Sequence, residues 1–317
     1  MPSVCSLAIT LALFAVVAQG QQQQPALNAN QIMARVAANQ DRSESARAHF
    51  VYVQHARVFS RKGSTIRCEE LTDTRITPTP TGSHQQLLTL NGRLLHKGSY
   101  ITYNRLPAAA PAGKDAPDTN DPRASIKAAD NDDTTDLDLV ENMRDNLLGN
   151  KSGHAKDGIN DSLFPLTSKQ QADYEFTLVG REPRNGRDTF HIQFRPKDKS
   201  DFGWKGDAWI DTTTFQPVVI RTALSRRLPL GVRVLLGTNV PGIGFTVIYA
   251  PQPANQPGNE ADPVWFPVSL GSEFKIHVLF FFSRQIVIAA ENRDFEKTHV
   301  TSTILTPGQV AVAPPQP

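Results

Sequence analysis

The sequence lacks the short motifs by which many enzymes are recognised. It contains no G-x-S-x-G nucleophile elbow, no H-E-x-x-H helix, no C-x-x-C pair and no P-loop. Asp207 and Asp211 are four residues apart in a strand-like segment, which places them on one face and about 13 Å apart, too far to act on one bond. We interpret them as solvated charges at a strand edge. The sequence therefore predicts no catalytic residues, no metal ligands and no cofactor, and favours a protein that is not an enzyme.

Long hydrophobic runs are also missing, and the one short run predicts a signal peptide over residues 1–20. Leu7–Ala18 is apolar but too short to span a bilayer. Ala18 and Gly20 fit the small-x-small cleavage pattern, although no Lys or Arg precedes the apolar run. We therefore expect an exported protein whose mature chain starts at Gln21 and contains no transmembrane helix.

Cysteine and unbalanced charge are scarce as well. The chain has two cysteines, and 33 Lys and Arg residues nearly balance 31 Asp and Glu residues, for a net charge of +2. No basic stripe with interleaved aromatic residues occurs, so we expect no nucleic-acid partner. Cleavage of the signal peptide would leave Cys68 as a single cysteine, which cannot form an internal disulfide. Cys68 is either a small residue packed in a strand or a reactive thiol.

The rest of the pattern predicts one β-rich domain over residues 28–303, after a polar linker at 21–27 and before a disordered tail at 304–317. The spacing of Ile32 and Val36 predicts an amphipathic helix at its start. The strand-like segments of the first half are His49–Ser60, Thr65–Ile76, His84–Leu95 and Ser99–Tyr103. Turn signals lie at Lys62-Gly63 and Asn91-Gly92.

A flexible insertion is predicted at about 106–160, where the composition changes to Pro, Ala, Gly and Asp. Within it, four apolar residues recur at helical spacing and predict an amphipathic helix: Leu137, Val140, Met143 and Leu147. Asp136 and Asp138 at its start suit the positive end of the helix dipole. These four apolar residues are lid candidates, and the N-terminal helix is a second candidate lid, although helices that merely plug the mouth of the barrel would show the same patterns.

The stretch Tyr174–Arg221 predicts three short antiparallel strands with an apolar face, because aromatic and aliphatic residues alternate along it. Asn185-Gly186 is a strong hairpin signal between the first two strands. Adjacent strands place same-face side chains side by side. We therefore expect one apolar surface, a candidate ligand-binding wall, made of Tyr174, Phe176, Phe190, Ile192, Phe194, Ile210 and Val218.

Several segments together resemble the lipoprotein-carrier superfamily, the LolA/LolB-like proteins and the related RseB-like sensors. They read F-V-Y-V-Q, Y-E-F-T-L-V-G, N-G-R-D-T-F-H-I-Q-F and W-K-G-D-A-W-I-D-T-T-T-F-Q-P-V. The resemblance implies a mainly antiparallel β (α+β) fold, a curved half-open β-barrel with lid helices, in a periplasmic protein. It also implies that the concave face receives acyl chains. The chain departs from LolA-type carriers in its larger size and its long insertion.

Three functions follow from this pattern. The first is a binding protein that holds a lipid or a lipidated protein in the concavity, and the second is a sensor that regulates a membrane-protein partner. The third is a secreted hydrolase, although the sequence contains no recognisable set of catalytic residues for it. An apolar face of about a dozen strands is larger than soluble monomers leave exposed, so a lid, a partner or a lipid must cover it. The alternative to an open cavity is a closed sandwich or barrel that is filled by its own side chains.

Overall fold

The structure is a computed structural model of the chain. It describes residues 27–79, 82–105, 134–148, 164–198, 203–225, 238–239, 243–252, 263–278 and 282–298. The predicted signal peptide, the predicted tail and most of the predicted linker and insertion lie outside these residues.

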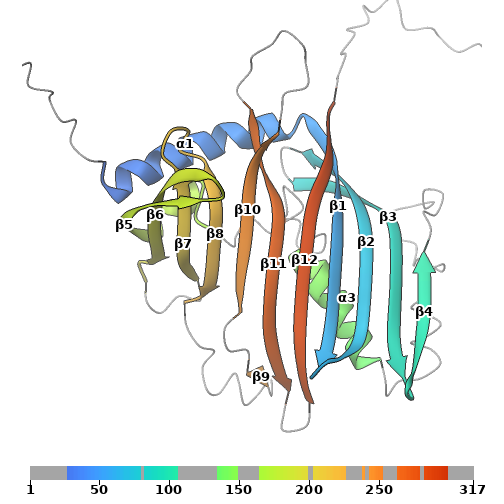
Figure 1. The fold of residues 1–317 in the computed structure, drawn as a ribbon. Helices are drawn as coiled ribbons and strands as arrows, with labels where there is room; N and C mark the ends of the chain where they lie inside the picture. Colours follow the sequence, from blue (N-terminus) through green and yellow to red (C-terminus); the bar gives the residue numbers. More distant parts are fainter. Residues whose placement is uncertain are drawn as a thin grey trace, which may run out of the picture.

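Three helices and twelve strands make up the described part of the chain (Figure 1). The helices are α1 (Ala29–Arg47), α3 (Thr135–Leu147) and α4 (Ser168–Gln171). The strands of the first half are β1 (Phe50–Lys62), β2 (Thr65–Thr79), β3 (Gly82–His96) and β4 (Ser99–Arg105). The later strands are β5 (Tyr174–Arg184), β6 (Arg187–Pro196), β7 (Trp204–Asp211), β8 (Pro217–Leu224), β9 (Thr238–Asn239), β10 (Gly244–Gln252), β11 (Val264–Val278) and β12 (Phe282–Lys297).

The strands form one antiparallel sheet in the order β4-β3-β2-β1-β12-β11-β10-β8-β7-β6-β5, with β9 paired to β11 off this path. The last strand, β12, lies beside the first, β1, and so joins the two halves of the chain. Within the described residues β4 and β5 do not pair with each other, so the sheet stays open at both edges. The predicted fold class, mainly antiparallel β with a curved sheet and few helices, is confirmed.

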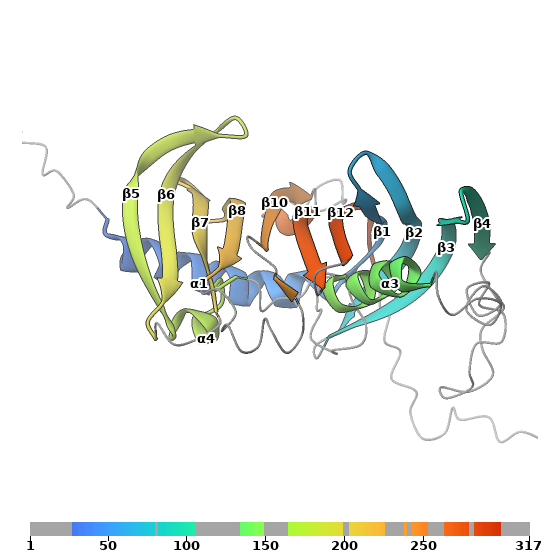
Figure 2. The same ribbon diagram turned by 90° about the horizontal axis from the view of Figure 1, so that it is seen from below.

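The sheet is strongly curved, as Figure 2 shows. Six of the described strand pairs carry a register shift: β1–β12, β1–β2, β10–β11, β2–β3, β5–β6 and β7–β8. A β-bulge bends its strand and increases the local twist. Because the shifts are spread from β3 to β5, the whole sheet bends rather than folding at one corner.

Both long helices pack against the same apolar cluster of the sheet and lie on the same side of it (Figure 2). The predicted N-terminal helix is confirmed as α1, which begins with a capping box formed by Asn28 and Gln31. Its residues Ile32 and Val36 are fully buried. Helix α1 crosses the strands of the β5–β11 half, whereas α3 lies over β1 and β2.

The turn predicted at Asn91-Gly92 is wrong, because both residues lie inside β3. Gly92 pairs with Glu70 on one side and with Tyr103 on the other. A Cβ atom at Gly92 would lie 2.1 Å from Cζ of Tyr103, so the glycine makes room for the aromatic ring of the neighbouring strand. In contrast, Asn185-Gly186 is the expected hairpin turn, with positive φ at both residues.

The stretch Tyr174–Arg221 contains four strands rather than the predicted three, because a tight turn separates β7 from β8. Asp211 builds this turn: its Oδ1 accepts hydrogen bonds from the backbone of Thr213 and Thr214, and its Oδ2 accepts one from Arg187 at 3.0 Å. Burial alone would raise the pKa of Asp211, but these hydrogen bonds outweigh it and lower the pKa. Asp211 is therefore a buried capping residue rather than the solvated charge that the sequence suggested, whereas the Asp207 side chain is 34% exposed and binds His191 at 2.8 Å.

Replacing Gly92 by alanine tests the packing of β3. We expect Gly92→Ala to lower the free energy of unfolding by about 1–3 kcal/mol, because the new methyl group overlaps the Tyr103 ring. Gly271→Ala is the matched control, since a Cβ atom on this β11 glycine would meet nothing within 4 Å. Its stability should change by less than about 1 kcal/mol. Equal losses in urea unfolding of the two variants would contradict this account of Gly92.

Candidate functional site

The structure brings the seven predicted wall residues together on one apolar surface. Ile192, Phe194, Ile210 and Val218 are buried in the main core cluster. Tyr174, Phe176 and Phe190 are half-buried and pack against the same cluster. The strand registers explain this, because Phe176 is opposite Phe194 and Phe190 is opposite Ile210.

Helix α1 covers this surface with Ile32, Met33 and Val36, each 1% exposed or less. The four buried wall residues are therefore part of a filled core in this structure. Among the wall residues, it is the half-buried Tyr174 and Phe176 that reach an open groove.

This groove, the α1–β5 groove, has a volume of about 500 Å³. It lies between the start of α1, α4 and the first half of β5, and its lining is mainly polar, with apolar side chains from Met33, Tyr174 and Phe176. Its lining residues are Asn30, Met33, Gln171, Tyr174, Glu175, Phe176, Thr177 and Lys197. Two of these residues also belong to the apolar interior: Met33 is in the main core cluster, and Phe176 packs against it. The groove therefore opens directly onto the apolar surface under α1.

The C-terminal half of α1 is anchored by polar contacts. Asn39 donates hydrogen bonds to the carbonyl oxygens of Thr214 (2.7 Å) and Phe215 (3.2 Å), in the β7–β8 turn. Gln40 binds Gln216 at 2.8 Å, and Arg47 donates to the carbonyl oxygen of Trp265 at 3.0 Å.

A second groove of about 460 Å³ lies beside this anchored half of α1. Its lining residues are Asn39, Arg42, Ser43, Ala46, Thr214, Gln216, Pro263, Val264 and Trp265.

The N-terminal half of α1 is held differently. Its described polar contact with the rest of the chain is a hydrogen bond from Gln171 to the carbonyl oxygen of Met33, at 2.9 Å. The guanidinium group of Arg35 lies 4.6 Å from the ring centre of Phe215. Apolar packing of Ile32, Met33 and Val36 therefore supplies most of its attachment to the sheet.

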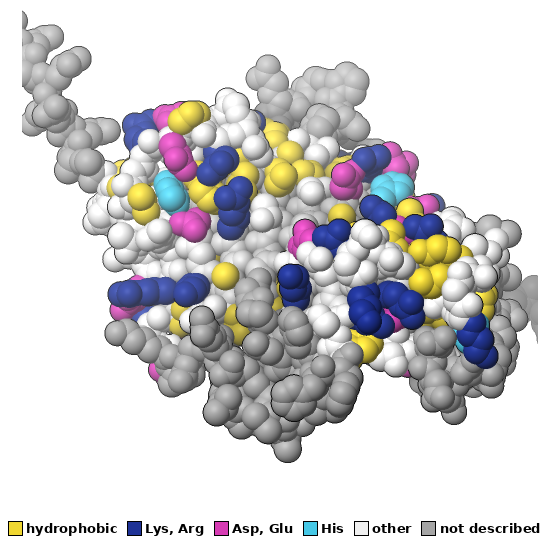
Figure 3. Space-filling view, turned by 60° about the horizontal axis from the view of Figure 1, so that its bottom comes forward, with side chains coloured by type: hydrophobic (Ala, Val, Ile, Leu, Met, Phe, Trp, Pro, Cys, Tyr) yellow, Lys and Arg dark blue, Asp and Glu magenta, His cyan; other side chains and the backbone are white. Residues whose placement is uncertain are grey.

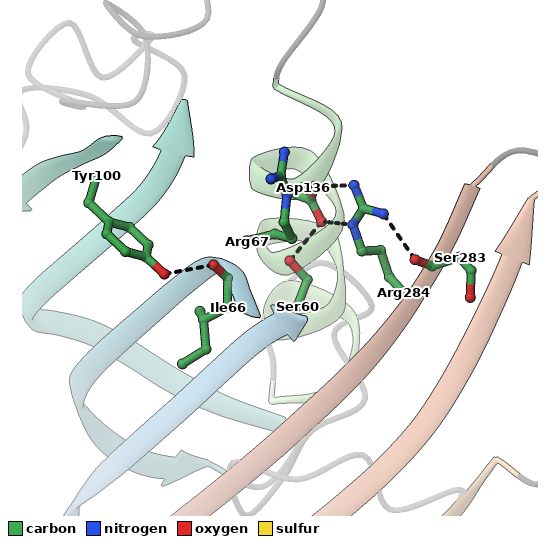
Figure 4. Close-up of polar contacts among 7 residues, drawn as sticks. All are labelled: Ser60, Ile66, Arg67, Tyr100, Asp136, Ser283 and Arg284. Carbon is green, nitrogen blue, oxygen red and sulfur yellow. Dashed lines mark hydrogen bonds and ion pairs between the residues drawn. The ribbon is translucent and has the colours of Figure 1, made fainter. Parts of the chain in front are cut away.

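Helix α3 is fixed by a buried ion-pair cluster at its N-terminal end (Figure 4). Asp136 accepts two hydrogen bonds from Arg284 of β12, at 2.7 and 2.8 Å, and one from the Ser60 hydroxyl of β1, at 2.8 Å. Arg67 of β2 lies 3.6 Å from the same carboxylate. Asp136 thus binds three strands, which is a larger role than the helix-dipole interaction predicted from sequence.

A second ion pair fixes α3 near its C-terminal end. Arg144 donates to Glu70 of β2 at 2.5 Å, and the Tyr103 hydroxyl donates to the other Glu70 oxygen at 3.0 Å. Glu70 is 1% exposed. The hydroxyl of Tyr103 also lies 3.7 Å from Sγ of Cys68, and burial together with the nearby Glu70 raises the pKa of Tyr103.

The four lid candidates do lie on one helix that faces the sheet. Leu137 and Val140 are fully buried, and Met143 and Leu147 pack against the core cluster. Two ion pairs hold α3 in place, whereas apolar packing supplies most of the attachment of the N-terminal half of α1. Sequence reasoning missed Ser60, Glu70 and Arg284. Ser60 and Glu70 could have been found from the sequence, because they are polar residues at inward-facing positions of strands that otherwise place apolar residues there.

Metal and membrane-span signals are absent from the described ranges. No group of three or more His, Cys, Asp or Glu side chains there could hold a metal ion. No helix in this part of the chain is long and apolar enough to cross a membrane.

No protein-family model matches the sequence, and no curated protein is similar to it in sequence. Similar solved structures include a DUF1329 family protein from Desulfovibrio piger, with a TM-score of 0.37, 10% identity and coverage of 87% of this chain and 96% of that chain. A LolA superfamily protein from Nitrosomonas europaea has a TM-score of 0.34, 11% identity and the same two coverages, 87% and 96%. The MucA/MucB complex from Pseudomonas aeruginosa has a TM-score of 0.21, 11% identity, and coverage of 84% and 99%.

These likenesses concern the fold alone.

Cys68 should be chemically inert in the folded protein. Burial raises the pKa of its thiol to about 12, so the thiol stays protonated at neutral pH. In a Cys5→Ser variant, we expect a thiol-reactive chromophore at pH 8 to label Cys68 only after denaturant is added, when its pKa returns to about 8.5. Rapid stoichiometric labelling of the folded protein would show that Cys68 is a reactive thiol.

The ion pair of Asp136 should control the attachment of α3. We expect Asp136→Asn to cost about 3–5 kcal/mol of stability, because Arg284 would keep its buried charge without a carboxylate partner. Amide hydrogen exchange in α3 should accelerate strongly. Asp138→Asn is the comparison, because it removes an acidic group from the same first helical turn and leaves the pair of Asp136 with Arg284 in place. Similar exchange rates in the two variants would contradict the claim that the ion pair of Asp136 holds α3 in place.

Proposed function

We propose that the protein is a periplasmic binding protein that holds an acyl chain, of a lipid or a lipidated protein, on the apolar surface under the N-terminal half of α1. One observation carries the proposal. The apolar surface runs without interruption from the buried Ile192 and Phe194 to the half-buried Tyr174 and Phe176, and there it opens into the α1–β5 groove. The groove offers the end of an acyl chain a route beneath the helix.

Helix α1 and an acyl chain would each gain a similar free energy by covering the apolar surface. Burying an aliphatic side chain is worth about 1.5–3 kcal/mol, so Ile32, Met33 and Val36 together hold α1 down with roughly 5–9 kcal/mol. An acyl chain of about 16 carbons gains about 0.8 kcal/mol per buried methylene, roughly 10 kcal/mol before ordering costs. An acyl chain can therefore displace the N-terminal half of α1, while the polar contacts of Asn39 and Gln40 keep the helix attached at its other end.

The groove carries no arrangement of groups suited to bond cleavage among its described lining residues. Its titratable side chains are Glu175, Lys197 and Tyr174. Glu175 is bound by Arg195 at 2.9 Å, and the Tyr174 hydroxyl accepts a hydrogen bond from the backbone of Trp204 at 3.3 Å. Binding without catalysis is the function that these contacts support best.

A second candidate function is that of a sensor or interaction protein for a membrane partner. The groove beside the anchored half of α1 favours it, since Arg42 and Asn39 lie there next to Val264 and Trp265, a mixture suited to a peptide. Co-purification of a membrane protein with this chain, and loss of that partner in Val264→Asp, would support the sensor over the carrier.

Titration with a fluorescent fatty acid tests the acyl-binding proposal. We expect saturable binding to the unaltered protein and at least a tenfold weaker affinity in Phe176→Asp, because a carboxylate would be placed at the mouth of the apolar surface. Val179→Asp is the control, since Val179 is on the same strand but 53% exposed. Ile192→Asp is unsuitable, because it buries an unpaired charge and should cost several kcal/mol of stability. Absence of binding to the unaltered protein, or equal losses in Phe176→Asp and Val179→Asp, would refute the proposal.

A further inference from the structure

One end of the sheet concentrates basic side chains. The strand registers place Arg61 of β1 opposite Gln285 of β12, and Gln285 in turn opposite Lys275 of β11. Arg284 is the neighbouring residue of β12, and the Tyr100 hydroxyl of β4 reaches the backbone oxygen of Ile66 of β2, at 2.9 Å. The β1–β2 and β3–β4 turns end at this level too. We call the resulting set the basic rim: Arg61, Lys62, Arg67, Lys97, Lys275 and Arg284. The Arg284 side chain is only 11% exposed and is bound by Asp136, so the outer part of the rim consists of the other residues.

The described acidic groups at this end do not balance the basic rim. Glu273 pairs with Arg61 at 2.8 Å, Asp136 pairs with Arg284, and Asp138 lies in the first turn of α3. The six basic residues thus face three acidic ones, in a chain whose overall charge is only +2.

Further along the strands, the buried Glu69 is bound by both Arg57 and Arg93, so it adds no unpaired negative charge to this end of the sheet. Lys62, Lys97 and Lys275 are all exposed.

Exposed apolar side chains lie beside these charges. Tyr100 is 44% exposed and Ile101 is 38% exposed, and they are two of the four large hydrophobic side chains exposed among the described residues. The guanidinium group of Arg93 lies 4.9 Å from the ring centre of Tyr100. Figure 3 shows Lys and Arg side chains around a hydrophobic patch on the right of the molecule, the side on which Figure 1 draws β1–β4.

We infer that the exposed lysines of the basic rim, Lys62, Lys97 and Lys275, together with Tyr100 and Ile101, dock the protein on an anionic lipid bilayer. Basic side chains near such a surface are attracted by its negative potential, and tyrosine favours the boundary between headgroups and acyl chains. The rim is formed by strand ends and turns of β1–β4, β11 and β12, whereas the α1–β5 groove lies at β5. Docking is thus a property separate from acyl binding and does not depend on it.

Vesicle co-sedimentation tests the inference. We expect the protein to sediment with phosphatidylcholine vesicles that contain phosphatidylglycerol, to stay in solution with phosphatidylcholine alone, and to be released by high salt. The triple variant Lys62→Gln, Lys97→Gln and Lys275→Gln should bind roughly 100-fold more weakly, since each basic residue contributes about 1 kcal/mol near an anionic surface. The control triple variant changes Lys169, Lys205 and Lys297 to glutamine, which removes the same charge from exposed positions elsewhere.

The outcomes are distinct. Equal losses in the two triple variants would mean that net charge rather than the rim governs binding, and would overturn the inference. Failure of the unaltered protein to sediment with anionic vesicles would overturn it as well, and capture of an acidic protein in place of vesicles would then identify a protein partner. Release of the unaltered protein from the anionic vesicles by high salt tests the role of charge without any variant. A positive fatty-acid titration together with negative sedimentation would refute docking and leave acyl binding standing.

Discussion

The open sheet imposes the constraint on which the rest of this structure depends. Its path of eleven antiparallel strands does not close on itself in the described residues, so its inward side chains form one continuous apolar face that water would otherwise reach. A face of this size must be covered for the chain to remain a soluble monomer. The bulges that curve the sheet reduce the area to be covered, and α1 and α3 cover much of what remains.

The two covering helices are attached by different kinds of interaction. Helix α3 is fixed by buried ion pairs at both ends, through Asp136 and Arg144, and leaving one charge of such a pair unpaired is costly. The N-terminal half of α1 is attached mainly by apolar side chains, which a hydrocarbon chain can replace at the loss of one described hydrogen bond, from Gln171 to the carbonyl oxygen of Met33. This difference is the physical reason for placing the exchangeable cover at α1 and the permanent one at α3.

Alternation along the strands was enough to predict a β-rich domain and the shared surface of the seven wall residues, because side-chain direction in a strand depends only on the local backbone. The curved, open form of the sheet was implied by the resemblance to the lipoprotein-carrier superfamily. Local patterns failed where distant residues decide the structure. Gly92 resembles a turn residue until the ring of Tyr103 is placed over it. Asp136 resembles a helix-dipole residue, yet its partners Ser60 and Arg284 are 76 and 148 residues away in the sequence.

Native mass spectrometry of the mature protein, purified without detergent from a host that contains lipids, tests the central claim most directly. The account predicts a population that carries one adduct of lipid mass, lost on extraction with organic solvent and restored by added fatty acid. In Phe176→Asp this adduct should be much reduced, whereas Val179→Asp should retain it. A protein that is lipid-free when purified and takes up no fatty acid afterwards would contradict the claim that the apolar surface under α1 binds acyl chains.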